Sequence, residues 1–134
     1  MDDILVARVM TSDPITVTAD TYVEPAANKL MDNGVGSLIV VDAAGALSGI
    51  LTTTDFVKIV AASKPKAETK VERYMSTDVT TASAQDSIAE AAEKMLDQGV
   101  HHLPVVDDEE GVIGIVSTTD LAAYISGLQA KKAR

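Results

Sequence analysis

Apolar residues follow two different spacings, which alternate along the chain. Short β-branched runs at residues 15–18 and 80–83 predict strands. Apolar residues at i, i+3, i+4, i+7 and i+8 follow each run and predict an amphipathic helix whose apolar face meets a core. These residues are Val23, Ala26, Ala27, Leu30 and Met31 in the first helix, and Ile88, Ala91, Ala92, Met95 and Leu96 in the second.

Helix-end signals accompany both of these helices. Thr21 and Glu24 have the spacing of a capping box, in which side chains and backbone N–H groups bond reciprocally at a helix start. Gly34 and Gly99 stand where a left-handed residue ends a helix.

Two continuous apolar runs then surround a short polar turn, which predicts a hairpin. The runs are 38–41 and 47–51 around DAAGA, and 103–106 and 112–116 around DDEEG. The glycine stands one place later in the second turn, which predicts different turn types. A second helix opens at Thr52 or Ser117, and its expected inward residues are Phe56, Ile59 and Val60, or Leu121, Tyr124 and Ile125.

The chain is an internal duplication. Residues 6–60 align with residues 71–125 at a constant offset of 65, and 21 of the 55 aligned positions are identical. Each copy reads β-α-β-β-α, which predicts an α/β (α+β) fold with domains at residues 1–65 and 66–134. A unit this small buries little apolar surface alone, so we expect the two to pack together. Short helices at 6–10 and at the end of the linker 64–73 are expected to lead into the unit that follows.

Composition and charge exclude several kinds of function. The net charge of −9 disfavours binding to nucleic acid and to anionic membranes, because both need a basic surface. The absence of cysteine excludes disulfides, thiolate metal sites and cysteine nucleophiles. The start MDDILVARVM is acidic and lacks a secretory pattern, and no apolar run is long enough to span a membrane. We therefore expect a cytoplasmic protein.

The ordered motifs resemble a known family. Each copy begins with VMTSD or YMSTD, has a helix ending in DNGV or DQGV, and continues through VVD to GILTTTD or GIVSTTD. This order, present twice over about residues 4–126, is similar to a tandem pair of cystathionine-β-synthase-type (CBS) domains. The resemblance implies a disc-like pair of units with pseudo-twofold symmetry and two clefts that bind adenosine-containing ligands. It also implies a regulatory module without catalytic activity, and a homodimer formed through the helices.

The repeated GILTTTD and GIVSTTD stretches have two readings. Thr52 and Asp55 have capping-box spacing, which would explain them without a ligand. Alternatively, a helix start offers unpaired N–H groups and a dipole suited to phosphate, with hydroxyls from Thr52 and Thr54, or Ser117 and Thr119. Asp55 or Asp120 could then accept hydrogen bonds from ribose. The resemblance implies that these hydroxyl and aspartate positions touch phosphate and ribose.

The resemblance also implies where adenine would lie. The expected slot is lined by the first strand and by the residues that enter the second: Ile15, Val35, Gly36 and Ser37 in the first copy, and Thr80, Val100, His101 and His102 in the second. Ordinary core packing is the competing explanation for the apolar positions among them.

The VHHLPVV stretch, residues 100–106, makes the second copy the stronger candidate. His101 and His102, before Leu103 and Pro104, match positions that reach ligand phosphates in the family, although two solvent-facing histidines would be the plain alternative. The first copy has Gly36 and Ser37 there and lacks these cations. A metal site is disfavoured because no third ligand is evident, and no residue cluster assembles a reaction.

Charge ranks the possible ligands. No cofactor is required, and an adenine nucleotide is the expected ligand, with AMP or ADP favoured over ATP because the chain is acidic. Magnesium could make ATP acceptable, and S-adenosylmethionine would suit the cation-poor first site. The leading hypothesis is a ligand sensor that acts through a homodimer or an unidentified regulated protein. The alternative is a dimerisation scaffold with vestigial clefts.

Overall fold

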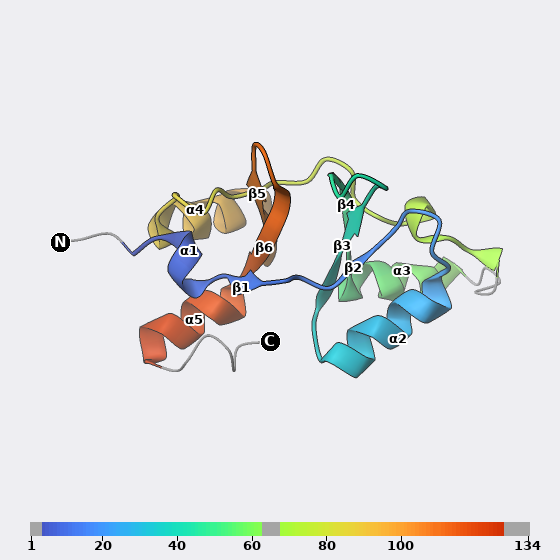
Figure 1. Cartoon of the computed structure of the whole chain (residues 1–134). Helices are drawn as coiled ribbons and strands as arrows, with labels where there is room; N and C mark the ends of the chain where they lie inside the picture. The colour runs from blue at the N-terminus through green and yellow to red at the C-terminus, as the bar shows by residue number, and fades with distance from the viewer. Residues whose placement is uncertain (1–3, 63–67, 128–134) are drawn as a thin grey trace. The chain divides into compact units, whose positions relative to one another are not determined.

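The computed structural model describes residues 4–62 and 68–127 (Figure 1). Its helices are α1 (Val6–Val9), α2 (Val23–Asn33), α3 (Thr53–Ala62), the 3₁₀ helix η2 (Val71–Arg73), α4 (Ile88–Gln98) and α5 (Thr118–Ser126). Its strands are β1 (Thr11–Ser12), β2 (Thr16–Val17), β3 (Ser37–Val41), β4 (Leu47–Thr52), β5 (His102–Asp107) and β6 (Gly111–Ser117). Within these residues no helix has the length and apolar content needed to cross a membrane.

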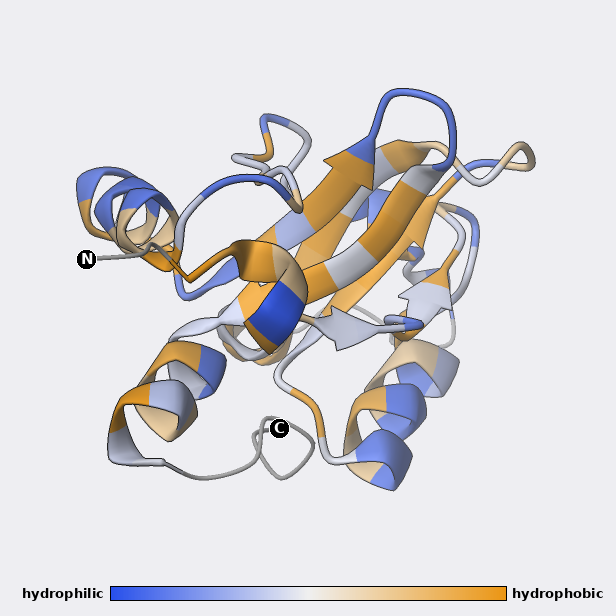
Figure 2. Ribbon diagram, turned by 60° about the vertical axis from the view of Figure 1, so that its left-hand side comes forward, coloured by the Kyte–Doolittle hydropathy of each residue, from blue (hydrophilic) through white to orange (hydrophobic). Residues whose placement is uncertain are grey.

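The first repeat folds around a three-stranded sheet in the order β2-β3-β4. β2 runs parallel to β3, and β3 and β4 form the predicted antiparallel hairpin. The centres of β3 and β4 are buried against α2, and the cluster beneath them contains Val17, Ala26, Leu30, Leu38 and Leu51. Figure 2 shows apolar strands beside helices that have one hydrophilic side.

The second repeat builds a matching sheet in the order β1-β6-β5. Its core contains Ala91, Met95, Leu103, Val105 and Val116, and each of these residues has an equivalent core position in the first repeat or lies beside one. The predicted strand at 80–83 is wrong as a strand, because only an isolated parallel bridge joins Ala82 to Val105. The mixed α/β class is confirmed in both repeats.

Each repeat is completed by the segment that precedes the other repeat. We call residues 4–12 the first arm and residues 68–76 the second arm. The first arm buries Val6 and Val9 in the second-repeat core, and β1 pairs with β6 (Figure 1). The second arm buries Val71 in the first-repeat core. By contacts, the compact units therefore contain residues 4–14 with 80–127, and residues 15–62 with 68–79.

The expected short helices at 6–10 and at the end of the linker are present as α1 and η2, and each packs on the core of the repeat other than the one that follows it. Sequence periodicity reports which residues repeat, and it cannot report which copy an arm contacts. The two arms make equivalent hydrogen bonds at their starts: Val6 N–H donates to the Asp86 carbonyl at 2.8 Å, and Val71 N–H donates to the Thr21 carbonyl at 2.8 Å.

The end of each arm packs closely against a glycine of the sheet that it joins. A Cβ atom on Gly114 would lie 2.8 Å from the Thr11 carbonyl oxygen and 2.9 Å from the Met10 sulfur. A Cβ atom on Gly49 would lie 2.6 Å from the Ser76 carbonyl oxygen and 3.0 Å from the Met75 sulfur. Any side chain at either position would displace the arm, which explains why glycine stands at both positions.

Several predicted inward residues are exposed instead. The exposed fractions are 71% for Met31, 81% for Leu96, 72% for Val60 and 80% for Ile125, and Tyr124 is also exposed. Ile59 is buried as predicted, and Phe56 and Leu121 are half-buried against the cores. The buried arc of α2 is narrow and centres on Val23, Ala26 and Leu30, so the edge of the predicted apolar stripe faces away from the sheet.

The predicted capping box of Thr21 and Glu24 is wrong. The helix begins one residue later, with Tyr22 at the N-cap and no side-chain cap. The Thr21 hydroxyl instead accepts the Thr18 N–H at 3.2 Å. Gly34 and Gly99 do end α2 and α4 with φ values of 62° and 66°, which confirms those two predictions.

Candidate ligand site

The predicted first-repeat site residues converge at the start of α3. Ser37 lies opposite Thr52 in the β3–β4 ladder, and Thr53 N–H donates to the Gly36 carbonyl at 3.2 Å. Ile39 N–H donates to the Ile15 carbonyl at 3.1 Å, which ties the first strand to the same strand β3. We call Ile15, Val35, Gly36, Ser37, Thr52, Thr54 and Asp55 the first ligand group.

The second-repeat residues converge in the same way at the start of α5. His102 lies opposite Ser117 in the β5–β6 ladder, and Thr118 N–H donates to the His101 carbonyl at 3.0 Å. We call Thr80, Val100, His101, His102, Pro104, Ser117, Thr119 and Asp120 the second ligand group. In each repeat, the residues that enter the second strand therefore lie beside the residues that open the second helix.

A capping box is complete only in the second group. Ser117 N–H donates to Asp120 Oδ2 at 2.9 Å, and Asp120 N–H donates to Ser117 Oγ at 3.2 Å. In the first group Thr52 N–H donates to Asp55 Oδ2 at 2.8 Å, and the Thr52 hydroxyl reaches the same oxygen at 3.3 Å. The capping-box interpretation is thus confirmed only for the carboxylate of Asp55 in the first group, whereas Ser117 and Asp120 form the whole box.

The start of each helix offers a ligand fewer donors than the sequence suggested. The N–H of Thr118 already has a carbonyl acceptor, and the N–H of Asp120 already has the Ser117 hydroxyl. The side chains of Thr54 and Thr119 are exposed, so their hydroxyls are open to solvent. Ser37 is only 5% exposed, so its hydroxyl is largely covered. The Thr54 and Thr119 hydroxyls are therefore the available donors.

The electrostatics of both groups are unfavourable to phosphate at neutral pH. Asp120 and Asp55 are 2% and 7% exposed, which places an acidic side chain inside each group. Burial, with a smaller contribution from neighbouring His101, lowers the pKa of His102 below its ordinary value of 6.5. His102 is therefore neutral at pH 7 in the ligand-free chain and does not supply a positive charge at its position.

Pro104 changes the backbone around Thr80. Pro104 occupies the position of Ile39, whose N–H bonds to the Ile15 carbonyl in the first repeat. A proline has no N–H, so the equivalent bond to the Thr80 carbonyl cannot form. Its own carbonyl still accepts the Ala82 N–H at 2.9 Å. This explains why the predicted strand at 80–83 is reduced to a bridge.

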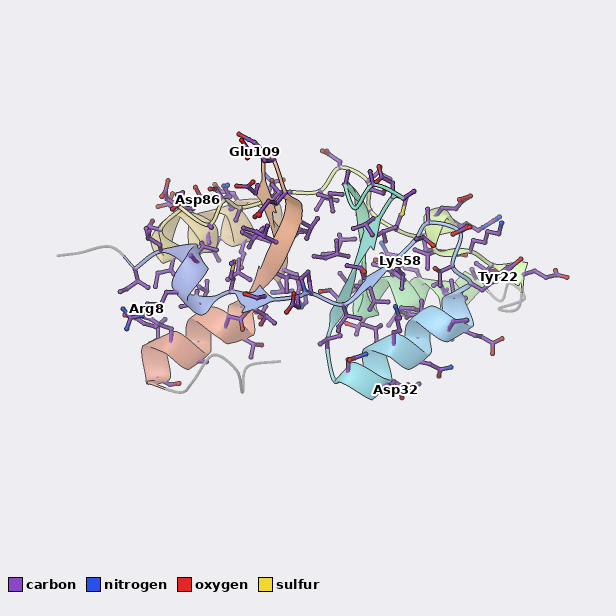
Figure 3. The ribbon with its side chains drawn as sticks, in the orientation of Figure 1. Arg8, Tyr22, Asp32, Lys58, Asp86 and Glu109 are labelled. Atoms are coloured by element: carbon purple, nitrogen blue, oxygen red, sulfur yellow. The ribbon has the colours of Figure 1, made fainter. Side chains whose placement is uncertain are left out.

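Sequence reasoning missed a lysine in each repeat that bonds to the backbone of the segment 15–18 or 80–83. Lys29 Nζ donates to the Thr16 carbonyl at 2.7 Å, and Lys94 Nζ donates to the Thr81 carbonyl at 2.9 Å. Lys94 also forms an ion pair with Asp86 at 3.2 Å (Figure 3 labels Asp86). The pKa of Asp86 is lowered, first by the hydrogen bond from Ser83 N–H and then by Lys94. Lysine at aligned positions of both copies was the available signal.

Two hollows lie within single repeats, and neither contains a ligand-group residue. One, of about 270 Å³, lies between α2 and α3 and is lined mainly by Val23, Ala27, Phe56 and Val60. The other, of about 490 Å³, lies beside Lys94, Asp86 and the β5–β6 turn that carries Glu109 in Figure 3. Among residues 4–62 and 68–127, no cluster of three His, Asp or Glu side chains could hold a metal ion.

Comparison with known proteins decides the family. The model of the CBS domain matches residues 6–62 and again residues 71–127. The chain belongs to the CBS domain family. Each CBS match joins one arm to the body that follows it, whereas each compact unit joins an arm to the other body. The CBS sequence unit and the contact unit are therefore different in this chain.

Similar proteins include a 17.7 kDa protein and much longer enzymes. A 17.7 kDa protein of Acidianus ambivalens is 33% identical over 87% of the chain and 70% of its own length. A homoserine O-acetyltransferase of Methanosalsum zhilinae is 32% identical over 93% of the chain, which spans only 25% of that protein. The match to this enzyme therefore concerns a CBS segment of it.

The fold also matches a solved CBS domain pair. That structure contains 5′-methylthioadenosine and S-adenosyl-L-methionine. It has 30% sequence identity and a TM-score of 0.86, and the match covers 94% of this chain and 98% of the other. The CBS pair is thus a fold in which adenosine ligands bind.

Proposed function

We propose that this chain is a regulatory CBS pair that binds an adenosine-containing ligand through its two ligand groups. The observation that carries the proposal is the convergence, in each repeat, of a buried aspartate, an exposed hydroxyl and the strand residues beside them. The aspartate oxygens would accept the ribose hydroxyls, and Ile15 or Thr80 would lie beside adenine. The chain would act without catalysis.

The charge of the groups favours ligands with little negative charge. Each group contains a buried aspartate, His102 is neutral at pH 7, and the whole chain carries −9. Coulombic repulsion grows with ligand charge, so 5′-methylthioadenosine, S-adenosylmethionine and AMP should bind ahead of ADP and ATP. The ligands of the similar CBS pair support this order. Magnesium would reduce the penalty for ATP.

The protein that responds to ligand binding is proposed to be a second copy of the chain or a regulated protein in the cytoplasm. Met31, Val60, Leu96 and Ile125 leave apolar surface exposed on the helices of both repeats. This surface would support the homodimer that the family resemblance implies. The same surface fits the second candidate function, a dimerisation scaffold. The capping bonds also favour the scaffold, because they explain the two aspartates without a ligand.

A thermal-shift panel separates the two candidates. The purified chain is heated with 5′-methylthioadenosine, S-adenosylmethionine, AMP, ADP, or ATP with magnesium, and adenine-free ribose 5-phosphate is the control. We expect stabilisation by the adenosine compounds in that order, because a ligand that binds only the folded state raises its stability. No shift with any of them, together with a stable dimer by analytical ultracentrifugation, would establish the scaffold instead.

A further inference from the structure

Histidine occurs at two adjacent positions of the second ligand group and nowhere else in the chain. The His101 carbonyl accepts the Thr118 N–H at 3.0 Å, and His102 lies opposite Ser117 in the β5–β6 ladder. Backbone pairing therefore fixes both histidines beside the residues that open α5. The first ligand group has glycine and serine at these positions, so it contains no side chain that titrates near neutral pH.

The two histidines differ in burial. The side chain of His101 is exposed, whereas that of His102 is half-buried. Burial, and then the neighbouring His101, lowers the pKa of His102, because loss of water disfavours the charged imidazolium. An anion placed beside a buried imidazole has the opposite effect and favours the charged form. The charge of His102 therefore depends on what lies beside it.

Other ionisable side chains around His102 titrate far from neutral pH. β6 and the segment 80–83 contain none, and Asp120 stands at the start of α5. The other elements packed on this core contribute Asp107 at the far end of β5, Tyr124 of α5, Arg8 of α1, and Glu90, Glu93, Lys94 and Asp97 of α4. Within this neighbourhood only His101 and His102 have an unperturbed pKa near neutral, and only His102 is partly covered.

An anionic group held at the start of α5 would lie beside His102. Thr119 offers its exposed hydroxyl there, and residues paired across an antiparallel ladder, as His102 and Ser117 are, have Cα atoms about 5 Å apart. Asp120, which is 2% exposed, repels such a ligand. Salt screens charges only beyond about 8 Å, so a positive charge on His102 would act on the same anion and offset this repulsion.

We propose that His102 is the specificity-determining residue of the second ligand group, and that its protonation shifts the preferred ligand from an uncharged adenosine compound to one that carries a phosphate. The inference rests on the proposed function, because it concerns the ligands of that group. Above neutral pH His102 is neutral, Asp120 acts alone, and 5′-methylthioadenosine binds ahead of AMP. Below about pH 6 the phosphate of AMP stabilises the imidazolium, so AMP gains affinity as the proton is taken up.

The first experiment measures the pKa of each histidine by NMR on the wild-type chain. Two histidines give two sets of imidazole signals, and His101→Gln assigns them by removing one set. The free chain should show a pKa below 6.5 for His102. Saturating AMP should raise this pKa by roughly one unit or more, because a phosphate stabilises the cation, and saturating 5′-methylthioadenosine should not raise it. The same His102 pKa with both ligands, or a change at His101 alone, would overturn the proposal.

The second experiment measures both affinities by calorimetry at about pH 7.5 and about pH 5.5, with folding checked by circular dichroism. All chains carry Asp55→Ala, which disables the first group. The ratio of the AMP affinity to the 5′-methylthioadenosine affinity should rise by about five-fold or more at the lower pH. His102→Ser, which installs the residue of the first repeat, should retain only the change that titration of the AMP phosphate itself produces. His101→Gln is the matched variant and should keep the full pH dependence of the ratio.

Failure of the proposed function and failure of this inference have different signatures. If neither compound binds at either pH, the proposed function fails and the inference fails with it. If both bind and the ratio is independent of pH, or changes equally in the His102→Ser chain, only the inference fails. If the His102→Ser chain does not fold, the imidazole pKa values measured on the wild-type chain decide alone.

Discussion

The two repeats bury equivalent cores, and they differ where the strands approach the ligand groups. Leu38 and Leu103 are both fully buried, and the lysines Lys29 and Lys94 make the same backbone contact. In contrast, the second repeat has Pro104 at the position of Ile39 and His102 at the position of Ser37. Duplication has thus kept the scaffold and changed the residues beside the site.

These differences make the two groups chemically unequal. The first has a two-residue strand β2 paired with β3, an incomplete capping box and a buried serine. The second has a strand reduced to a bridge, a complete capping box and a histidine whose pKa is lowered. The second group therefore holds its aspartate more firmly. Its Thr80 carbonyl, however, has no equivalent of the hydrogen bond that the Ile15 carbonyl accepts from the Ile39 N–H.

The largest expected effect comes from giving the first repeat the second repeat's proline. Ile39→Pro removes the N–H that bonds to Ile15 and part of a side chain that is 0% exposed. We expect a loss of roughly 3 kcal/mol or more in the free energy of unfolding, measured by urea denaturation. A loss below about 1 kcal/mol would show that the β2–β3 pairing contributes little.

The reverse change provides the control. Pro104→Ile restores an N–H opposite the Thr80 carbonyl, and the new amide should be protected from hydrogen exchange. If that amide exchanges as fast as an exposed one, the absence of a strand at 80–83 has another cause than the missing N–H.

A smaller effect should distinguish the two helix caps. Ser117→Ala removes the hydroxyl that accepts the Asp120 N–H and donates to its carboxylate, and it should cost about 1 kcal/mol. Thr52→Ala removes only a 3.3 Å contact and should cost less, about 0.5 kcal/mol. Thermal unfolding of both variants measures the difference. Equal costs would mean that the caps are equivalent in solution.

The smallest expected effect is a pH dependence confined to the second repeat. Burial lowers the pKa of His102 in the folded chain, so the unfolded chain takes up this proton first as pH falls below about 6.5. Stability should therefore decrease between that pH and the lower folded-state pKa, and His102→Gln should remove this part of the decrease. The low pKa of Asp86 acts in a separate window, below about pH 4. Identical profiles for both chains above pH 5 would contradict the assignment.

Much of each repeat could be predicted from the sequence because the copies corroborate each other. The hairpins, the helix-ending glycines and the convergence of Thr52 with Ser37 follow from local spacing that appears twice. The exposure of Met31 and Leu96 could not be predicted, since periodicity gives an apolar stripe without the width of the buried arc.

The exchange of arms is not predictable from a duplication. Val6 and Val71 occupy the same position of the repeat, so either could complete either core by sequence alone. The lowered pKa of His102 also depends on burial, which arises only when β5 pairs with β6. Both features are tertiary, so they depend on contacts that local sequence spacing does not report.

The central claim is that an adenosine ligand binds at the aspartate groups and more tightly at the second. Calorimetry with 5′-methylthioadenosine on the wild-type chain, Asp55→Ala and Asp120→Ala tests it most directly. We predict that Asp120→Ala abolishes the tighter binding event and that Asp55→Ala retains it, with both variants folded by circular dichroism. Retention of the tighter event by Asp120→Ala, or its loss in Asp55→Ala alone, would contradict this account.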